Sequence, residues 1–335
     1  MVSMRSFNGD VPFLAGPSIL PTSATSMTAP SAGRRRRPTN PVRDNPAMTG
    51  TRPSTALIDP TTLAATMAAD RPAGAAPVLL DVRWSVAGPQ RDAYLAGHLP
   101  GAVFADLDDD LAAPPGRLGR HPLPDPVALQ GFLRSAGVSD GTPVVVYDGS
   151  NSSIAARAWW LLRWAGHRDV RVLDGGYRGW QRAGMPVETG VPIAPTPGSC
   201  TVRPGSMPVV DIDGAAAIAT GDPAAGVLLD ARAAERYRGE VEPLDPVAGH
   251  IPGAVSLPLT DLVTEQGVFR DPDELAARFA AAGVIPGVVA VASCGSGVTA
   301  CHLILAGELA GLQLALYPGS YSGWCAAGRP VATTP

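Results

Sequence analysis

The chain repeats itself, and this repeat constrains the fold more than any other feature of the sequence. The segment VLLDVR at 78–83 returns as VLLDAR at 227–232, and GHLPGA at 97–102 returns as GHIPGA at 249–254. The separation between copies is roughly 150 residues each time, which is the size of an ordinary domain. We therefore expect two copies of one domain in tandem.

The length and the local composition predict where these domains begin and end. The 335 residues suit two domains, which we expect at 51–190 and 206–335, joined by a proline-rich linker at 191–205. Residues 1–50 are rich in Ser, Thr, Pro and Arg and show no apolar period. We expect this segment to be a disordered N-terminal extension, with its arginine run a solvated tail rather than a basic arm or targeting peptide.

Short apolar runs alternate with helical patterns in each copy. The runs at 78–81, 144–147 and 170–173 are typical of buried parallel strands. This alternation predicts an α/β fold in which each domain has a central, mainly parallel sheet flanked by helices. Ligands of such sheets bind beyond the carboxyl ends of the strands, which places Asp148 and Cys294 at equivalent mouths of the two domains.

Charge and composition exclude several classes of function. The net charge is −4, and all 26 basic residues are arginine. The absence of lysine from the sequence removes Schiff-base, pyridoxal-phosphate and P-loop lysine chemistry. No metal-binding spacing and no apolar run of membrane-spanning length occurs in the sequence. We expect no metal, no cofactor, no nucleic-acid or membrane partner, and a cytoplasmic location.

The loop at 294–300, CGSGVTA, follows an apolar strand and opens a helical stretch. Its glycines, Gly295 and Gly297, permit a tight turn in which successive N–H groups converge on one point. That point also lies at a helix N-terminus, where negative charge is stabilised. A cysteine in this position is expected to be largely thiolate near neutral pH. The alternative is an inert, buried cysteine in a glycine-rich turn.

These features together resemble the two-domain rhodanese sulfurtransferases over roughly residues 55–335. Thiosulfate-type members of that family typically place Arg-Lys after the cysteine, whereas mercaptopyruvate-type members place Gly-Ser, as this chain does with Gly295 and Ser296. The resemblance therefore implies transfer of sulfur from 3-mercaptopyruvate through a persulfide on Cys294, with release of pyruvate. A thioredoxin-like protein, a small thiol or cyanide would accept the sulfur. In the family the N-terminal domain has lost the cysteine, and here Asp148 stands in its place.

The resemblance also implies supporting residues. A proton-handling set of Ser, His and Asp matches Ser296, His121 and Asp108, although Asp108 could be part of a solvated acidic run and His121 an ordinary loop residue. A carboxylate-binding arginine of the family matches Arg238. The second family arginine is missing from the segment EPLD at 242–245, and Arg120 is the candidate to compensate. The backbone of the loop would contribute further substrate contacts, at Gly295, Gly297, Val298 and Thr299.

Three alternatives can be weighed on the same residues. Phosphatases of the same fold need an arginine six positions after the cysteine, and Ala300 stands there. A thiosulfate:cyanide sulfurtransferase would use the same cysteine with another donor, although the Arg-Lys pair is absent. A third alternative is a non-catalytic sulfur relay, or a module whose loop only binds an anion or a partner, and the intact Cys294 argues against it.

Overall fold

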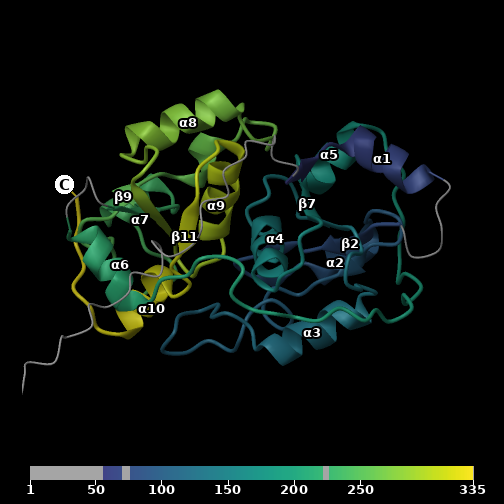
Figure 1. The fold of residues 1–335 in the computed structure, drawn as a ribbon, viewed down its shortest axis with the longest axis horizontal. Coiled ribbons are helices and arrows are strands. Elements are labelled where there is room, and N and C mark those ends of the chain that lie inside the picture. The colour runs from purple at the N-terminus through teal and green to yellow at the C-terminus, as the bar shows by residue number, and fades with distance from the viewer. Residues whose placement is uncertain (1–55, 70–75, 222–225, 335) are drawn as a thin grey trace, which may run out of the picture. The chain divides into compact units, whose positions relative to one another are not determined.

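The computed structural model describes residues 56–69, 76–221 and 226–334. The extension predicted at 1–50 lies outside the described residues. Within them the chain forms two parallel sheets, of five and four strands, each flanked by helices (Figure 1). This confirms the α/β fold class predicted from the alternation of strand and helix patterns.

The strand order shows the repeat directly. The first sheet has the order β1-β7-β6-β2-β5 and the second the order β11-β10-β8-β9, so the last four strands of the first correspond one by one to the second. The strands of the first sheet are β1 Leu57–Ile58, β2 Val78–Asp81, β5 Val103–Phe104, β6 Val144–Tyr147 and β7 Val170–Leu173. Those of the second are β8 Gly226–Asp230, β9 Val255–Ser256, β10 Val289–Ser293 and β11 Leu314–Leu316. A separate antiparallel pair is formed by β3 Trp84–Ser85 and β4 Gly88–Pro89.

Helices connect these strands, and several begin at an Asp-Pro pair. In α1 and α3 the aspartate side chain accepts N–H groups of the first turn and proline occupies the first helical position. The helices of the first domain are α1 Pro60–Ala68, α2 Arg91–Ala96, α3 Pro126–Ser135, α4 Ala155–Trp164 and α5 Gly176–Arg182. Those of the second are α6 Ile212–Ala219, α7 Ala234–Arg238, the 3-10 helix η1 Leu259–Leu262, α8 Pro272–Ala281, α9 Ala300–Leu309 and α10 Ser320–Ala326. No described helix has the length and apolar character needed to span a membrane.

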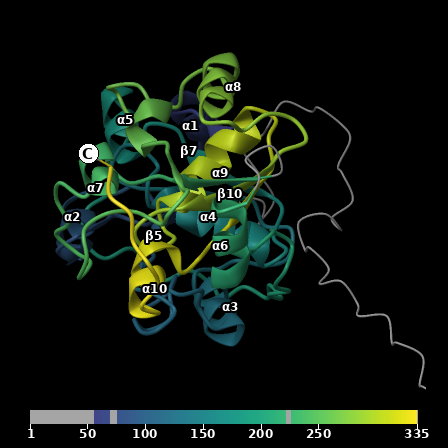
Figure 2. The same cartoon turned by 90° about the vertical axis from the view of Figure 1, so that its left-hand side faces the viewer.

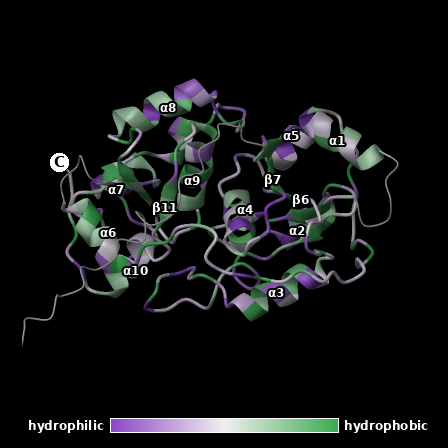
Figure 3. Cartoon of the chain, in the orientation of Figure 1, coloured by the Kyte–Doolittle hydropathy of each residue, from purple (hydrophilic) through white to green (hydrophobic). Residues whose placement is uncertain are grey.

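Alternate residues of each strand face opposite helix layers. In the first sheet Leu80 and Val146 belong to one buried cluster, whereas Leu79 and Val145 belong to another. The outer helices α3 and α8 contain both hydrophobic and hydrophilic residues (Figure 3), and they bury Leu129 and Leu133 of α3 and Leu275 and Phe279 of α8. The inner helices α4 and α9 lie together in Figure 1 and in Figure 2, and an ion pair joins Arg163 to Glu308 across them. The cluster around α4 and α9 contains residues of both domains, so the domains share a core.

Candidate active site

Cys294 directly follows β10, a strand with a parallel neighbour on each side. The flanking strands β8 and β11 fix the end of β10, and α9 begins six residues after the cysteine. The side chain is buried, and the backbone N–H of Gly297 donates to Sγ at 3.1 Å. The backbone N–H of Cys294 itself donates to the hydroxyl of Ser320 at 3.0 Å. The sulfur is therefore held in a turn that offers it a main-chain donor.

One glycine of this loop, Gly297, cannot be exchanged for a larger residue, and a second, Gly295, has an arginine side chain beside it. Gly297 has a φ of +80°, and a Cβ there would collide with the carbonyl of Pro318. A Cβ on Gly295 would lie 2.9 Å from Nη2 of Arg120. The loop then passes through the buried Val298 to Thr299, whose carbonyl accepts an N–H of the first turn of α9. The close approach of Pro318 and the positive φ explain why glycine stands at position 297.

A chain of hydrogen bonds reaches the loop from the first domain. Nδ1 of His121 lies 2.7 Å from the hydroxyl of Ser296, and Nε2 lies 3.0 Å from Oδ1 of Asp108. The indole N–H of Trp84 donates to Oδ2 of Asp108 at 2.9 Å, and the Trp84 ring meets the imidazole edge to face. With the Asp108 carboxylate accepting from Nε2–H, Nδ1 is the acceptor for the Ser296 hydroxyl. The structure thus brings together the three residues predicted as a proton-handling set.

The surroundings of His121 favour its neutral form. Burial lowers the pKa of the imidazole below its ordinary value, and the nearby carboxylate of Asp108 only partly offsets this effect. The positive charges of Arg157 and Arg120 lower the pKa further. A neutral ring can accept a proton from Ser296, which is the property that a base needs.

Arg157 extends from α4 to the loop that carries Cys294. Its guanidinium, fully buried, donates to the carbonyls of His121 at 3.2 Å, Pro122 at 3.1 Å and Gly297 at 3.4 Å. Burial lowers the pKa of Arg157. Among the described residues, the groups that act in the other direction and raise this pKa are the thiols of Cys301 and Cys294 rather than carboxylates. One cation therefore ties the loop that carries His121 to the loop that carries Cys294.

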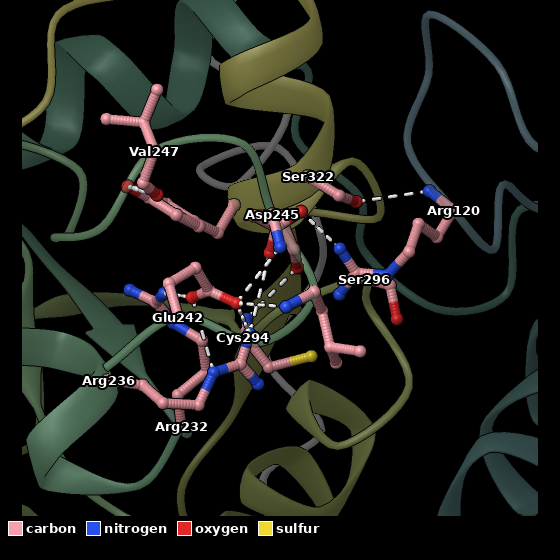
Figure 4. Close-up of polar contacts among 12 residues, drawn as sticks. Arg120, Arg232, Arg236, Glu242, Asp245, Val247, Cys294, Ser296 and Ser322 are labelled. Carbon is pink, nitrogen blue, oxygen red and sulfur yellow. Dashed lines mark hydrogen bonds and ion pairs between the residues drawn. The ribbon is translucent and has the colours of Figure 1, made fainter. Parts of the chain in front are cut away.

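Two arginines lie beside Gly295, and we call this position the mouth of the loop. Arg120 from the first domain and Arg236 from α7 both place guanidinium nitrogens within 4 Å of the point where a Cβ on Gly295 would be. Figure 4 shows them gathered with Glu242 and Asp245 around the segment that carries Cys294. Arg120, predicted to compensate for a missing arginine, is thus at the site.

Arg238, the other arginine predicted to bind substrate, points elsewhere. Its guanidinium pairs with Glu240 at 2.7 Å and 3.0 Å, and both side chains are exposed. Arg236 stands two residues earlier in the same short helix and faces the loop instead. Residues two positions apart on a helix point in nearly opposite directions. Arg236, and not Arg238, therefore lies beside Gly295.

In the matching loop of the first domain, the carboxylate of Asp148 accepts the main-chain N–H groups of the turn. Asp148 is buried, and its two oxygens accept four backbone N–H groups at 2.9 to 3.1 Å. The donors belong to residues of the turn and of the start of α4, namely Ser150, Ser152, Ile154 and Ala155. The main-chain donors that would otherwise face a ligand are already occupied, so this loop is a structural counterpart of the Cys294 loop.

Sequence reasoning missed four residues of the site: Arg236, Arg157, Trp84 and Ser320. Ser320 adopts a φ of +49°, which is rare for a residue other than glycine, and it holds the N–H of Cys294. The only sequence signal for Ser320 was the replacement of the glycine at the equivalent position, Gly176, by serine. Trp84 and Arg157 gave no signal, because nothing local relates them to residues far along the chain.

Comparisons with known proteins identify the family of the chain. A family profile described as "Rhodanese-like domain" matches residues 60–183 and 214–327. A "Probable 3-mercaptopyruvate sulfurtransferase" of Pseudomonas aeruginosa is 46% identical over 269 residues, covering 76% of this chain and 92% of the relative. A "Thiosulfate sulfurtransferase" of Bos taurus is 36% identical over 258 residues, covering 73% of this chain and 84% of the relative.

A solved structure shares the fold. SseA from Escherichia coli, described with the rhodanese fold and catalytic mechanism of 3-mercaptopyruvate sulfotransferases, superposes with a TM-score of 0.69 at 32% identity. The match covers 80% of this chain and all of SseA. With two matched domains and relatives of this similarity, the chain belongs to the rhodanese family and is a sulfurtransferase with tandem rhodanese-like domains.

Proposed function

We propose that the protein transfers sulfur from 3-mercaptopyruvate through a persulfide on Cys294 to a thiol or to cyanide. The observation that carries the proposal is the chain Asp108–His121–Ser296, which ends on the loop of Cys294. Transfer from mercaptopyruvate needs a proton carrier, and this chain supplies one beside the nucleophile.

The proposed reaction has two sulfur transfers. The Cys294 thiolate attacks the sulfur of mercaptopyruvate, a sulfur–sulfur bond forms, and the carbon–sulfur bond breaks with its electron pair going to carbon. The leaving group is the enolate of pyruvate, which takes up a proton to become pyruvate. A thiolate or cyanide then attacks the outer sulfur of the persulfide and regenerates the Cys294 thiolate. Electrons are exchanged only among the donor, Cys294 and the acceptor, so the reaction uses no other oxidant or reductant.

The hydrogen bond between Ser296 and His121 provides a route for the proton transfers of the reaction. The donor thiol must lose a proton, and the enolate must gain one. Ser296 can pass a proton to or from Nδ1 of His121, while Asp108 orients the ring and stabilises it when protonated. The N–H of Gly297, which already donates to Sγ, would stabilise the negative charge of the persulfide.

The arginines at the mouth would orient the donor. Arg236 and Arg120 present guanidinium groups beside Gly295, and a guanidinium binds a carboxylate with two parallel hydrogen bonds. Substituting Arg236→Ala should therefore raise KM for mercaptopyruvate far more than Arg238→Ala. A larger effect of Arg238→Ala would return the role to that residue.

The donor preference tests the proposal as a whole. We expect kcat/KM for mercaptopyruvate to exceed that for thiosulfate by at least about tenfold, which is about 1.4 kcal/mol of transition-state stabilisation. The comparison is made on the wild type and on Cys294→Ser, which should lose both activities. Equal or reversed preference would favour a thiosulfate sulfurtransferase.

A further inference from the structure

The two carboxylates at the mouth of the Cys294 loop, Glu242 and Asp245, differ in the number of hydrogen bonds that they accept. Glu242 accepts Arg236 at 2.6 and 3.3 Å, Arg232 at 3.3 Å and two backbone N–H groups of its own turn at 3.0 Å. Asp245 pairs with Arg120 through Oδ1 alone. Its Oδ2 is buried, accepts no hydrogen bond from the described residues and lies 3.5 Å from Nη2 of Arg236.

This difference separates an anchored group from a displaceable one. Burial opposes ionisation of Glu242, but its hydrogen bonds outweigh that effect and lower its pKa. Burial raises the pKa of Asp245, and the neighbouring charge of Glu242 acts in the same direction. Asp245 is the less satisfied of the two carboxylates, although both side chains are only 3% exposed.

The charges at the mouth cancel in pairs. Asp230 neutralises Arg232, Glu242 neutralises Arg236, and Asp245 neutralises Arg120. Among the residues that the structure describes, an incoming anion therefore meets no uncompensated guanidinium next to Gly295 (Figure 4). It can gain a full ion pair only by taking the place of one carboxylate, and Asp245 has the fewest bonds to lose.

We propose that Asp245 is a specificity-determining residue whose carboxylate occupies the Arg120 and Arg236 guanidinium groups in place of an anionic ligand. The inference rests on the proposed function, because it assigns these arginines to the sulfur donor. Asp245 weakens binding of every anionic donor. It penalises a dianion such as thiosulfate more than a monoanion such as mercaptopyruvate, because repulsion scales with the charge of the ligand. It thereby performs part of the discrimination between the two donors.

The test measures anion binding without turnover. Pyruvate serves as the monoanionic probe and sulfate as the dianionic probe, titrated calorimetrically into the Cys294→Ala protein with and without Asp245→Asn. We expect Asp245→Asn to lower the Kd of pyruvate by about tenfold, or about 1.4 kcal/mol, and to lower the Kd of sulfate by a larger factor. Asp245→Glu keeps the charge and should stay near the parent protein.

A matched control is available on the same segment. Glu240→Gln removes an exposed carboxylate that pairs with Arg238 and should leave both Kd values unchanged. An unchanged or raised Kd for pyruvate in a folded Asp245→Asn protein would overturn the inference. If Asp245→Asn does not fold, Asp245→Ser takes its place. Failure of both to fold would also overturn it, because a carboxylate that substrate displaces cannot be essential to the fold.

The outcome is separable from that of the proposed function. Tighter anion binding in Asp245→Asn together with no turnover of mercaptopyruvate would support the role of Asp245 and reject the donor. Turnover of mercaptopyruvate with unaltered anion binding would do the reverse.

Discussion

At the scale of single residues, His121 of the first domain lies between two partners. One is Ser296, on the nucleophile loop of the second domain, and the other is the carboxylate of Asp108, in its own domain. The two ring nitrogens of His121 have different partners, so the ring is held in one orientation. The two candidate donors place different demands on this ring. Mercaptopyruvate leaves as an enolate that needs a proton, whereas thiosulfate leaves as sulfite, which needs none.

His121→Asn should therefore affect the two donors unequally. We expect kcat/KM for mercaptopyruvate to fall by about a hundredfold, a typical size for loss of a proton carrier, with a much smaller change for thiosulfate. Ser296→Ala should show the same selectivity. Parallel initial-rate measurements with both donors check this, and an equal loss with both would make His121 a purely structural residue.

The pH profile should follow the lowered pKa of His121. Because burial lowers the pKa of the imidazole, kcat/KM for mercaptopyruvate should fall toward acid pH as the ring becomes protonated, with the midpoint of this limb below the ordinary histidine value of 6.5. Asp108→Asn removes a contribution that raises this pKa, so the acid limb should move to still lower pH. A limb at or above pH 6.5, or a limb that moves upward in Asp108→Asn, would contradict the assignment.

At the scale of elements, the two strand-end loops use one backbone design for two purposes. After β10 the turn leaves a main-chain donor facing a sulfur, whereas after β6 the turn is filled by Asp148. Replacing that buried carboxylate with a methyl group leaves four N–H groups without an acceptor.

Asp148→Ala should consequently destabilise the protein by about 2 to 4 kcal/mol, the range expected when buried donors lose their acceptor. Asp125→Ala is the matched control, because Asp125 also accepts two N–H groups but caps α3 at an exposed position. Its cost should be about 1 kcal/mol. The free energies of unfolding in urea give both values, and equal losses would show that the Asp148 loop is not specially dependent on its carboxylate.

The elements also show how far sequence reasoning could reach. The strands β2, β6 and β7 coincide with the predicted runs, since uninterrupted apolar runs are a local property. The sequence named Arg238 and overlooked Arg236, which the structure places beside Gly295, because a five-residue helix leaves its orientation to tertiary contacts. Asp108 and His121 were found only through the family resemblance. Their link to Ser296 spans 175 residues of sequence, and no local pattern encodes it.

At the scale of the whole described chain, the two domains share one buried cluster. It includes Trp160 and Leu162 of α4 together with Leu303 and Leu305 of α9. The fully buried Arg157 adds a hydrogen bond between α4 and the loop of the second domain. Neither helix can lose its partner without exposing apolar surface, so the domains should unfold together.

We therefore predict a single calorimetric transition for both domains. Leu162→Ala should lower the stability of that transition by about 3 kcal/mol without splitting it, because the side chain is buried in the shared cluster. Scanning calorimetry of the wild type and the variant measures this directly. Two resolved transitions, in either protein, would show that the domains are energetically independent.

The central claim is that sulfur passes through Cys294, and mass spectrometry of the intact protein tests it most directly. After incubation with mercaptopyruvate and no acceptor, we predict a gain of one sulfur atom per chain, located on Cys294 and removed by cyanide. The fully buried Cys301, whose pKa burial raises to about 12, should remain unmodified. Sulfur retained by Cys294→Ser, sulfur located on another cysteine, or no gain in the wild type would contradict the account.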